Sequence, residues 1–172
     1  MCPRQIVQLG KISNSKIEVN LFYSNEKRKQ NIVKILKKNG AKQIYGINYR
    51  SAKKLSGLDS ARRIVDKDGI YSADVVLVPL EDGDRTIALK KAKKKVITID
   101  LNPLSRTAQT ANVTIVDDVL RSITLLIKTV KSLSKKNHTH LQKIIKEFDN
   151  KKNLSTAVLE IRTNLVRRAR HA

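Results

Sequence analysis

Three short apolar runs constrain the fold of this chain more than any other feature. They are Asp74–Pro79 (DVVLVP), Lys95–Ile99 (KVITI) and Asn112–Val116 (NVTIV). Runs that are this short and continuously apolar are typical of strands buried on both faces of a parallel sheet. A helical pattern over Asp84–Lys93 lies between the first two runs, as a strand–helix–strand crossover requires. The sequence therefore predicts an α/β fold, with a largely parallel sheet and helices on both of its faces.

The residues before these runs predict further elements of the same kind. Lys16–Phe22 (KIEVNLF) and Gln43–Ile47 have the composition of strands, and Asn25–Lys38 between them has the apolar spacing of a helix. Ser24 is the expected N-cap of that helix. We also expect a short helix at the start of the chain and a polar loop after the second strand, at Pro3–Leu9 and Asn48–Ser60 respectively.

The apolar period changes to that of helices after Asp118. Apolar residues recur every three or four positions over 119–133, 141–148 and 154–165, with a turn expected at Asn150–Asn153. We therefore divide the chain into an α/β core, residues 1–118, and C-terminal helices, residues 119–172, that pack on the core or extend it.

The charge of the chain is unusually basic. Its 172 residues include 36 Lys and Arg against 15 Asp and Glu, a formal net charge of +21. The excess lies in residues 1–58 and 119–172, whereas residues 59–118 hold 10 basic and 10 acidic side chains. Nucleic-acid modules usually add stacking aromatics, but here four Tyr and two Phe are scattered and Trp is absent. A solvated lysine-rich surface is the favoured interpretation; a noncatalytic basic module that binds nucleic acid or an acidic partner is the alternative.

Cysteine content and hydropathy indicate the compartment. A single cysteine, Cys2, excludes a disulfide framework and a CxxC metal site. Apolar runs are too short for a membrane-spanning helix or a signal peptide. We therefore expect a cytoplasmic protein without a membrane partner.

Polar side chains follow all three apolar runs, where each predicted strand ends. Because ligands of parallel sheets bind beyond the carboxyl ends of the strands, these residues are the candidate site. Such a cluster of carboxylates needs cations or a metal, and Mg²⁺ with nucleotide phosphates would satisfy it. Asp84 and Ser105 are also candidate helix caps. The set comprises Glu81, Asp82, Asp84, Asp100, Asp117 and Asp118, with Arg85 and Arg106 for phosphate contacts.

Familiar phosphate and catalytic motifs are absent from the sequence. It contains no GxxxxGK[ST], GxGxxG, HExxH or GxSxG pattern. From the residues alone, the prediction is an α/β domain whose ligand edge bears acidic and arginine side chains.

Two segments narrow this prediction. Tyr71–Thr86 (YSADVVLVPLEDGDRT) and Val96–Ala108 (VITIDLNPLSRTA) together closely resemble the archaeal phosphopantothenate synthetase (4-phosphopantoate–β-alanine ligase) family. Glu147–Arg162 (EFDNKKNLSTAVLEIR) is similar to the C-terminal part of that family, so the resemblance covers essentially the whole chain.

The resemblance implies an ATP-dependent ligase of coenzyme A biosynthesis. It would join 4-phosphopantoate to β-alanine, release AMP and pyrophosphate through an acyl-adenylate, and form a homodimer with a Rossmann-like core. Glu81 and Asp84 are our candidates for Mg²⁺, and Asp82, Asp84 and Arg85 for catalysis or phosphopantoate contacts. The family's ATP contacts correspond here to Asp100, Leu101, Asn102, Arg106, Thr107, Asp118 and Val119.

Family members also carry a substantial segment before the position that matches Pro3, and its arginine-bearing loops touch ATP. This segment has no counterpart before Pro3, so the resemblance predicts an N-terminally truncated form, a fragment or a divergent short form of the ligase.

Overall fold

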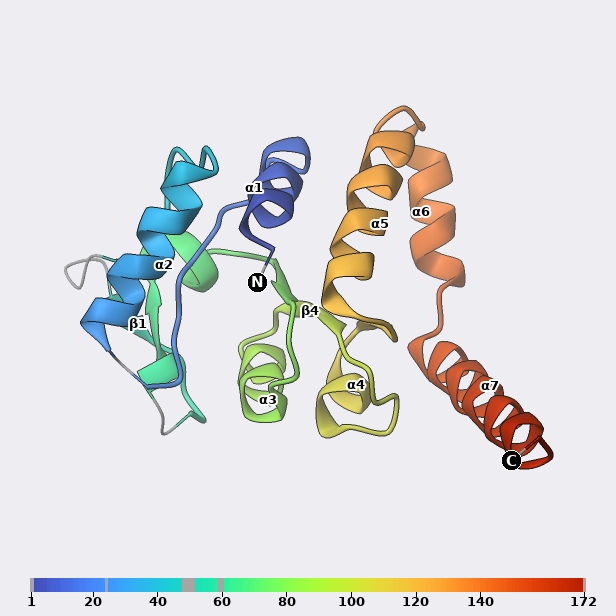
Figure 1. Cartoon of the computed structure of the whole chain (residues 1–172). Helices are drawn as coiled ribbons and strands as arrows, with labels where there is room; N and C mark the ends of the chain where they lie inside the picture. Colours follow the sequence, from blue (N-terminus) through green and yellow to red (C-terminus); the bar gives the residue numbers. More distant parts are fainter. Residues whose placement is uncertain (1, 24, 48–51, 59–60, 172) are drawn as a thin grey trace.

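The computed structural model describes residues 2–23, 25–47, 52–58 and 61–171. A parallel sheet of three strands, in the order β3–β4–β5, lies at its centre (Figure 1). These strands are β3 (Val75–Val78), β4 (Lys95–Ile99) and β5 (Val113–Ile115). Their pairing is parallel, with Val76 opposite Val96 and Thr98 opposite Thr114. The prediction of an α/β fold with a parallel sheet is therefore confirmed.

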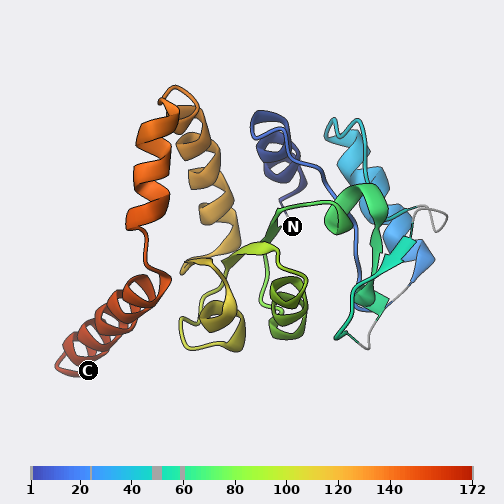
Figure 2. The ribbon, with the colours of Figure 1, turned by 180° about the vertical axis from the view of Figure 1, so that it is seen from behind.

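Helices cover both faces of this sheet. α3 (Gly83–Lys91) and the short α4 (Arg106–Thr110) lie on one face, and α1 (Pro3–Ile12) and α5 (Val119–Leu133) lie on the other, as Figures 1 and 2 show from opposite sides. Successive residues of β4 point to opposite faces, as a strand requires. Val96 accordingly packs in a core with Leu89 of α3, whereas Ile99 packs with Ile123 of α5.

The N-terminal region differs from the prediction. Lys16–Phe22 and Gln43–Ile47 do not form strands, because their pairing is reduced to a single parallel bridge between Glu18 and Tyr45. Two short antiparallel strands, β1 (Ala52–Lys54) and β2 (Ile64–Asp66), form instead, followed by the helical turn η3 (Lys67–Tyr71).

β1 lies inside the stretch 48–60 that was expected to be a loop, so that expectation is wrong for Ala52–Lys54. The polar AKK sequence of β1 gives no strand signal; its backbone is paired through the partner strand β2. The rest of that stretch is partly outside the described residues.

Helix starts also correct the sequence analysis. α2 (Glu26–Lys38) is capped by the side chain of Asn25, which accepts from Arg28 N at 2.9 Å; the predicted cap Ser24 lies outside the described residues. Asp82, rather than Asp84, caps α3. Ser105 caps α4 as predicted, because its Oγ accepts from Ala108 N at 2.9 Å.

The C-terminal helices are α5, α6 (His138–Glu147) and α7 (Asn150–Ala169). The turn expected at Asn150–Asn153 is the first turn of α7, capped by Asp149. Asn150 Oδ1 accepts from Thr114 N at 2.8 Å and Asn153 Nδ2 donates to Thr114 O at 2.9 Å, so both bind the outer edge of β5. The polar residues Asn150 and Asn153 have the composition of a turn, but they bind the backbone of Thr114, which is distant in the sequence.

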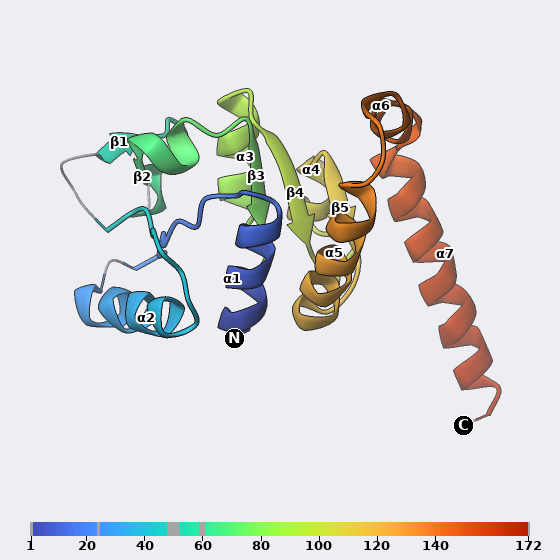
Figure 3. The same ribbon diagram turned by 90° about the horizontal axis from the view of Figure 1, so that it is seen from above.

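α7 extends away from the sheet beyond this anchor, as Figure 3 shows. Leu154, in the first turns of the helix, is its buried residue. Among the described residues, no helix has both the length and the apolar composition that crossing a membrane demands.

Candidate functional site at the carboxyl edge of the sheet

The residues that follow β3, β4 and β5 form one edge of the sheet. β3 and β4 are paired in parallel, as are β4 and β5, so their carboxyl ends point the same way. Asp100 N donates to Ile115 O at 3.0 Å, which continues the pairing of β4 and β5 up to the edge. The three predicted segments are therefore neighbours in space.

Asp82 is the most connected residue of this edge. Its Oδ1 accepts from Arg85 N at 3.1 Å, which caps α3. Its Oδ2 forms ion pairs with Arg62 and, at 3.4 Å, with Arg85 Nε. Asp82 is thus a largely buried carboxylate between two guanidinium groups, and one of them, Arg62, comes from the N-terminal region.

Arg85 faces inward. Its side chain is mostly buried, and its Nη2 donates to Oδ1 of Asn20 and, at 3.3 Å, to Asn20 O. Burial lowers the pKa of Arg85, the Asp82 carboxylate opposes that shift, and Arg62 adds to it. Arg85 therefore links the sheet edge to the N-terminal region, whereas the guanidinium of Arg106 is exposed at the edge.

Thr107 joins the segments that follow β3 and β4. Its hydroxyl accepts from Asp82 N at 3.0 Å and donates to Glu81 Oε1 at 2.9 Å. The side chain is fully buried. Thr107 therefore fixes the path of the Glu81–Asp82 segment.

Arg106 and Asp84 form the exposed part of the edge. Arg106 Nη2 lies 2.8 Å from Asp84 Oδ1, and their side chains are 62% and 58% exposed. The guanidinium crosses Gly83, where an added Cβ would come within 2.5 Å of Arg106 Nε. Glycine at position 83 therefore permits this close approach.

Asp100 organises the loop after β4. Its Oδ1 accepts from Asn102 N at 2.9 Å, and its Oδ2 accepts from the Ser105 hydroxyl. Asn102 Oδ1 in turn accepts from Leu104 N at 2.9 Å. Asp100 is buried, whereas Leu101 is 69% exposed. The carboxylate thus holds a loop that displays its neighbours.

Asp117 and Asp118 follow β5. Asp118 caps α5, because its Oδ1 accepts from Leu120 N at 2.9 Å and Arg121 N at 3.2 Å. Asp117 Oδ1 accepts from Arg121 Nε at 2.8 Å, and this bond, with one from Asp118 N, lowers the pKa of Asp117. Val119 is the first residue of α5.

Carboxylates are not clustered at this edge in the way that a preformed metal centre requires. Within the part of the chain that the structure describes, no three His, Cys, Asp or Glu side chains are placed to hold a metal ion. The predicted Mg²⁺ candidates are separately engaged, Glu81 by Thr107 and Asp84 by Arg106.

Four residues of this edge were not predicted from the sequence: Asn20, Arg62, Leu80 and Leu104. Leu80 and Leu104 are 66% and 68% exposed on the segments after β3 and β4. The two leucines were present in the quoted motifs, and their position among polar loop residues was the available signal. Asn20 and Arg62 gave no signal, because they approach Arg85 and Asp82 only through the fold.

Comparison with known proteins places the chain. A family model described as phosphopantothenate/pantothenate synthetase matches residues 1–164. The chain is 44% identical, over 98% of its length, to the 4-phosphopantoate–beta-alanine ligase of Thermococcus kodakarensis. It is 44% identical over 96% of its length to the ligase of that name in Methanosarcina mazei, and 42% over 98% to that of Thermococcus onnurineus.

The chain spans 64% of the length of each of these three relatives. The family match nevertheless extends over nearly all of the chain and includes the LEDGDRT and DLNPLSR segments at the sheet edge. The resemblance predicted from those motifs is confirmed, and the chain belongs to the phosphopantothenate/pantothenate synthetase family.

Proposed function

We propose that this chain catalyses the ligation of 4-phosphopantoate with β-alanine at the expense of ATP. The match to the synthetase family over residues 1–164, which includes every segment of the sheet edge, is the observation that supports this. In the proposed reaction, the substrate carboxylate attacks the α-phosphorus of ATP and pyrophosphate leaves. The β-alanine amine then attacks the acyl carbon, AMP leaves, and the amine loses a proton.

This reaction needs alignment and charge stabilisation rather than a side-chain nucleophile. Arg106 has an exposed guanidinium at this edge and is the proposed phosphate ligand. Leu101 and Asn102 are displayed by the loop that Asp100 holds, and we propose that they contact the nucleoside. Asp118 and Val119 complete the proposed ATP site from the start of α5.

Asp100 and Thr107 have a different proposed role. Both oxygens of the Asp100 carboxylate already accept hydrogen bonds within the loop, and the Thr107 hydroxyl is buried between Asp82 and Glu81. We propose that they position the ATP-binding segments. Asp82 and Arg85 act in the same way, since their ion pair connects the edge to the N-terminal region.

Mg²⁺ would accompany ATP in this site. It is bound in proteins by one or two carboxylates plus phosphate oxygens, so a full protein cage is unnecessary. Asp84 and Glu81 are both exposed residues of the segment that follows β3, and these two are the proposed ligands. Mg²⁺ would neutralise the charge of the transferring phosphoryl group.

We also propose that the chain forms a homodimer through its C-terminal helices. Large apolar side chains are exposed on α6, at its C-cap Phe148 and on α7, and apolar patches of this kind mark interaction surfaces. They are Ile144, Ile145 and Phe148, with Leu159, Ile161, Leu165 and Val166. Sedimentation of the wild-type chain and of Ile145→Lys tests this: the dimer should dissociate in the variant, and a monomeric wild type would refute it.

The activity is tested by AMP release from the 172-residue chain with ATP, Mg²⁺, 4-phosphopantoate and β-alanine. We expect release that requires both organic substrates. Release of pyrophosphate without release of AMP would limit the chain to the first half-reaction, which forms the acyl-adenylate. If no AMP forms and duplex DNA binds with an affinity that falls steeply with salt, the basic-module alternative replaces the ligase.

Site variants sharpen the test. Arg106→Ala should abolish ATP binding with the fold intact, because it removes the proposed phosphate ligand. Asp100→Ala should also abolish it, because the loop loses both of its carboxylate bonds. Arg28→Ala, on the exposed surface of α2, is the matched control and should bind ATP normally. Normal binding by both site variants would contradict the assignment.

A further inference from the structure

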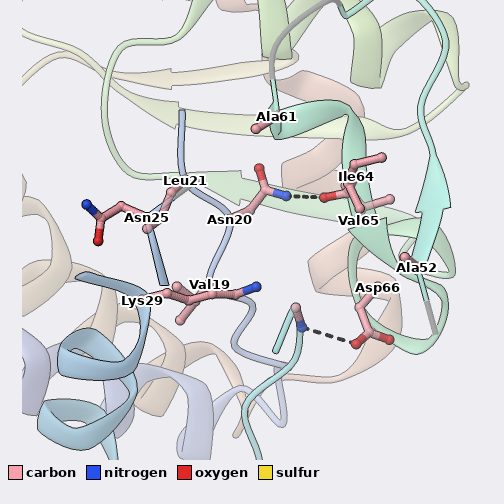
Figure 4. Close-up of a pocket in the computed structure, with 11 residues that line it drawn as sticks. Val19, Asn20, Leu21, Asn25, Lys29, Ala52, Ala61, Ile64, Val65 and Asp66 are labelled. Carbon is pink, nitrogen blue, oxygen red and sulfur yellow. Dashed lines mark hydrogen bonds between the residues drawn. The ribbon is translucent and has the colours of Figure 1, made fainter. Parts of the chain in front are cut away.

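A pocket lies in the N-terminal region, apart from the exposed edge described above. It has a volume of about 180 Å³ and lies between Val19–Leu21, the start of α2, β1 and β2 (Figure 4). This volume is below the roughly 300–1,000 Å³ of typical ligand pockets, so the pocket is too small for a nucleotide and has room only for the body of a small organic acid.

Aliphatic side chains form much of the pocket wall. Val19, Leu21, Ile64 and Val65 contribute branched hydrocarbon, and Ala52 lies across from them on β1. Branched apolar groups of a ligand would leave water on entering such a wall, which favours binding. The wall therefore selects a ligand with a compact, branched alkyl body.

Lys29 brings a positive charge to this wall. Its side chain is only 11% exposed, and its Nζ lies 4.0 Å from Glu26 Oε1. Charges interact more strongly away from bulk water, so this ammonium would attract an anionic group of a ligand. The Asp66 carboxylate accepts from Gly46 N at 3.1 Å and Asp68 N at 3.0 Å and holds the surrounding backbone.

Asn20 connects the pocket to the sheet edge. Its Nδ2 donates to Ile64 O at 2.6 Å across the pocket, as Figure 4 shows, and its Oδ1 accepts from Arg85. Arg85 pairs with Asp82, the cap of α3. The side of the pocket formed by Asn20 is thus two contacts away from the edge proposed to bind ATP.

We propose that this pocket binds the acid substrate, 4-phosphopantoate, through its branched body; this rests on the proposed function. The acid has a quaternary carbon with two methyl groups, matching the aliphatic wall, and an anionic group at each end. Its carboxylate must reach ATP and therefore lies toward Asn20, so its phosphate lies toward Lys29. β-Alanine fits less well, since it lacks branching and Lys29 would repel its ammonium group.

Calorimetric titration of the 172-residue chain with 4-phosphopantoate tests the pocket. Lys29→Met should weaken binding about tenfold or more, as expected for a lost charge-assisted bond. Ala52→Leu should weaken binding by filling the space. Lys27→Met and Lys53→Leu are matched controls, because each alters an exposed neighbour on the same element, and both should bind normally.

The pocket assignment is overturned if the wild-type chain does not bind 4-phosphopantoate. It is also overturned if Lys29→Met and Ala52→Leu bind 4-phosphopantoate as tightly as the controls do. The same holds if, in a parallel titration with β-alanine, the two substitutions weaken the binding of β-alanine alone. Circular dichroism shows whether each variant folds, and Ala52→Leu decides the test should Lys29→Met unfold.

AMP release is measured in parallel to separate this inference from the proposed function. If the chain releases AMP normally but Lys29→Met and Ala52→Leu bind 4-phosphopantoate as tightly as the wild type, only the pocket assignment is refuted. If the two substitutions weaken 4-phosphopantoate binding but the wild-type chain releases no AMP, catalysis by the chain is refuted and the pocket assignment stands.

Discussion

The parallel sheet and the N-terminal region satisfy their backbone groups in different ways. β3, β4 and β5 pair with one another, main chain to main chain. In the N-terminal region, side chains bind backbone groups far along the sequence: both oxygens of Glu18 accept from backbone N–H groups, at 3.1 Å from Asp66 N and 2.6 Å from Ile70 N. Order in the sheet therefore depends on paired apolar strands. The N-terminal region has an apolar cluster around Val19, Val33 and Leu36, and single polar residues fix its loops.

Removing a side chain from the core between the sheet and α3 should give the largest loss of stability. Leu89 of α3 is fully buried against Val96 and Val78. Leu89→Ala should lower the free energy of unfolding by about 2–5 kcal/mol, from lost burial and the cavity left behind. Urea unfolding measures this change.

Leu125→Ala is the control for that experiment, since Leu125 lies on α5 and is 59% exposed. It should change stability much less than Leu89→Ala. Equal effects of the two variants would show that burial against the sheet does not dominate its stability.

Glu18→Ala tests the N-terminal region in the same way. The variant leaves two partly buried N–H groups, of Asp66 and Ile70, without their acceptor. It should lower the free energy of unfolding by about 1–3 kcal/mol, the usual cost of unsatisfied buried donors. Amide exchange should accelerate at Asp66 and Ile70 and remain slow at Val96.

Glu160→Ala, an exposed change on α7, is its control. If Glu18→Ala matches this control in stability and in exchange, polar side chains do not order the N-terminal region, and the contrast with the sheet is wrong.

The contrast explains which parts of the fold could be predicted. β4 was found with its observed ends, because a continuous apolar run reflects burial in a parallel sheet. Lys16–Phe22 has an equally strand-like composition, but the side chains of Glu18 and Asn20 hydrogen-bond to backbone groups of Ile70 and Ile64. Strand pairing in this segment is reduced to one bridge, between Glu18 and Tyr45. Local periodicity does not register such long-range bonds.

The candidate site shows the same division. The segments after the three strands were placed together correctly, because parallel pairing dictates where strand ends lie. The contacts of Arg85 were not predictable, since they depend on Asn20, 65 residues away. Topology thus located the edge, whereas the roles of its side chains required the structure.

The pH dependence of stability gives a smaller test of the N-terminal region. Burial raises the pKa of Glu18 above 4.5, the neighbouring Asp66 charge adds to the rise, and the two backbone bonds oppose it. The folded chain thus holds this proton more tightly than the unfolded chain. The contribution of the protonated Glu18 side chain to the free energy of unfolding is therefore fully present below about pH 4.5. It is lost as the pH rises through the pKa of Glu18 in the folded chain.

Glu18→Gln removes this titration. The stability of the wild type relative to Glu18→Gln should fall as the pH increases from 4 toward 7, measured by urea unfolding at each pH. A difference that stays constant with pH would mean that Glu18 titrates as it does in the unfolded chain.

The smallest effect should come from the exposed pair at the end of β5. Arg121 lowers the pKa of Asp117 by hydrogen bonding, but both groups are exposed to solvent. Arg121→Ala should raise the Asp117 pKa toward its ordinary value, as followed by carboxyl NMR. Because the depressed pKa stabilises the fold only above the unfolded pKa and is lost as pH falls, any stability change should appear near neutral pH and shrink in acid.

High salt should weaken this shift, since exposed charges are screened within about 10 Å at 0.1 M salt. The same salt series should leave the Glu18 shift nearly unchanged, because burial rather than an exposed charge causes it. An equal response of the two carboxyl groups to salt would erase the distinction between an exposed pair at the sheet edge and a buried group in the N-terminal region.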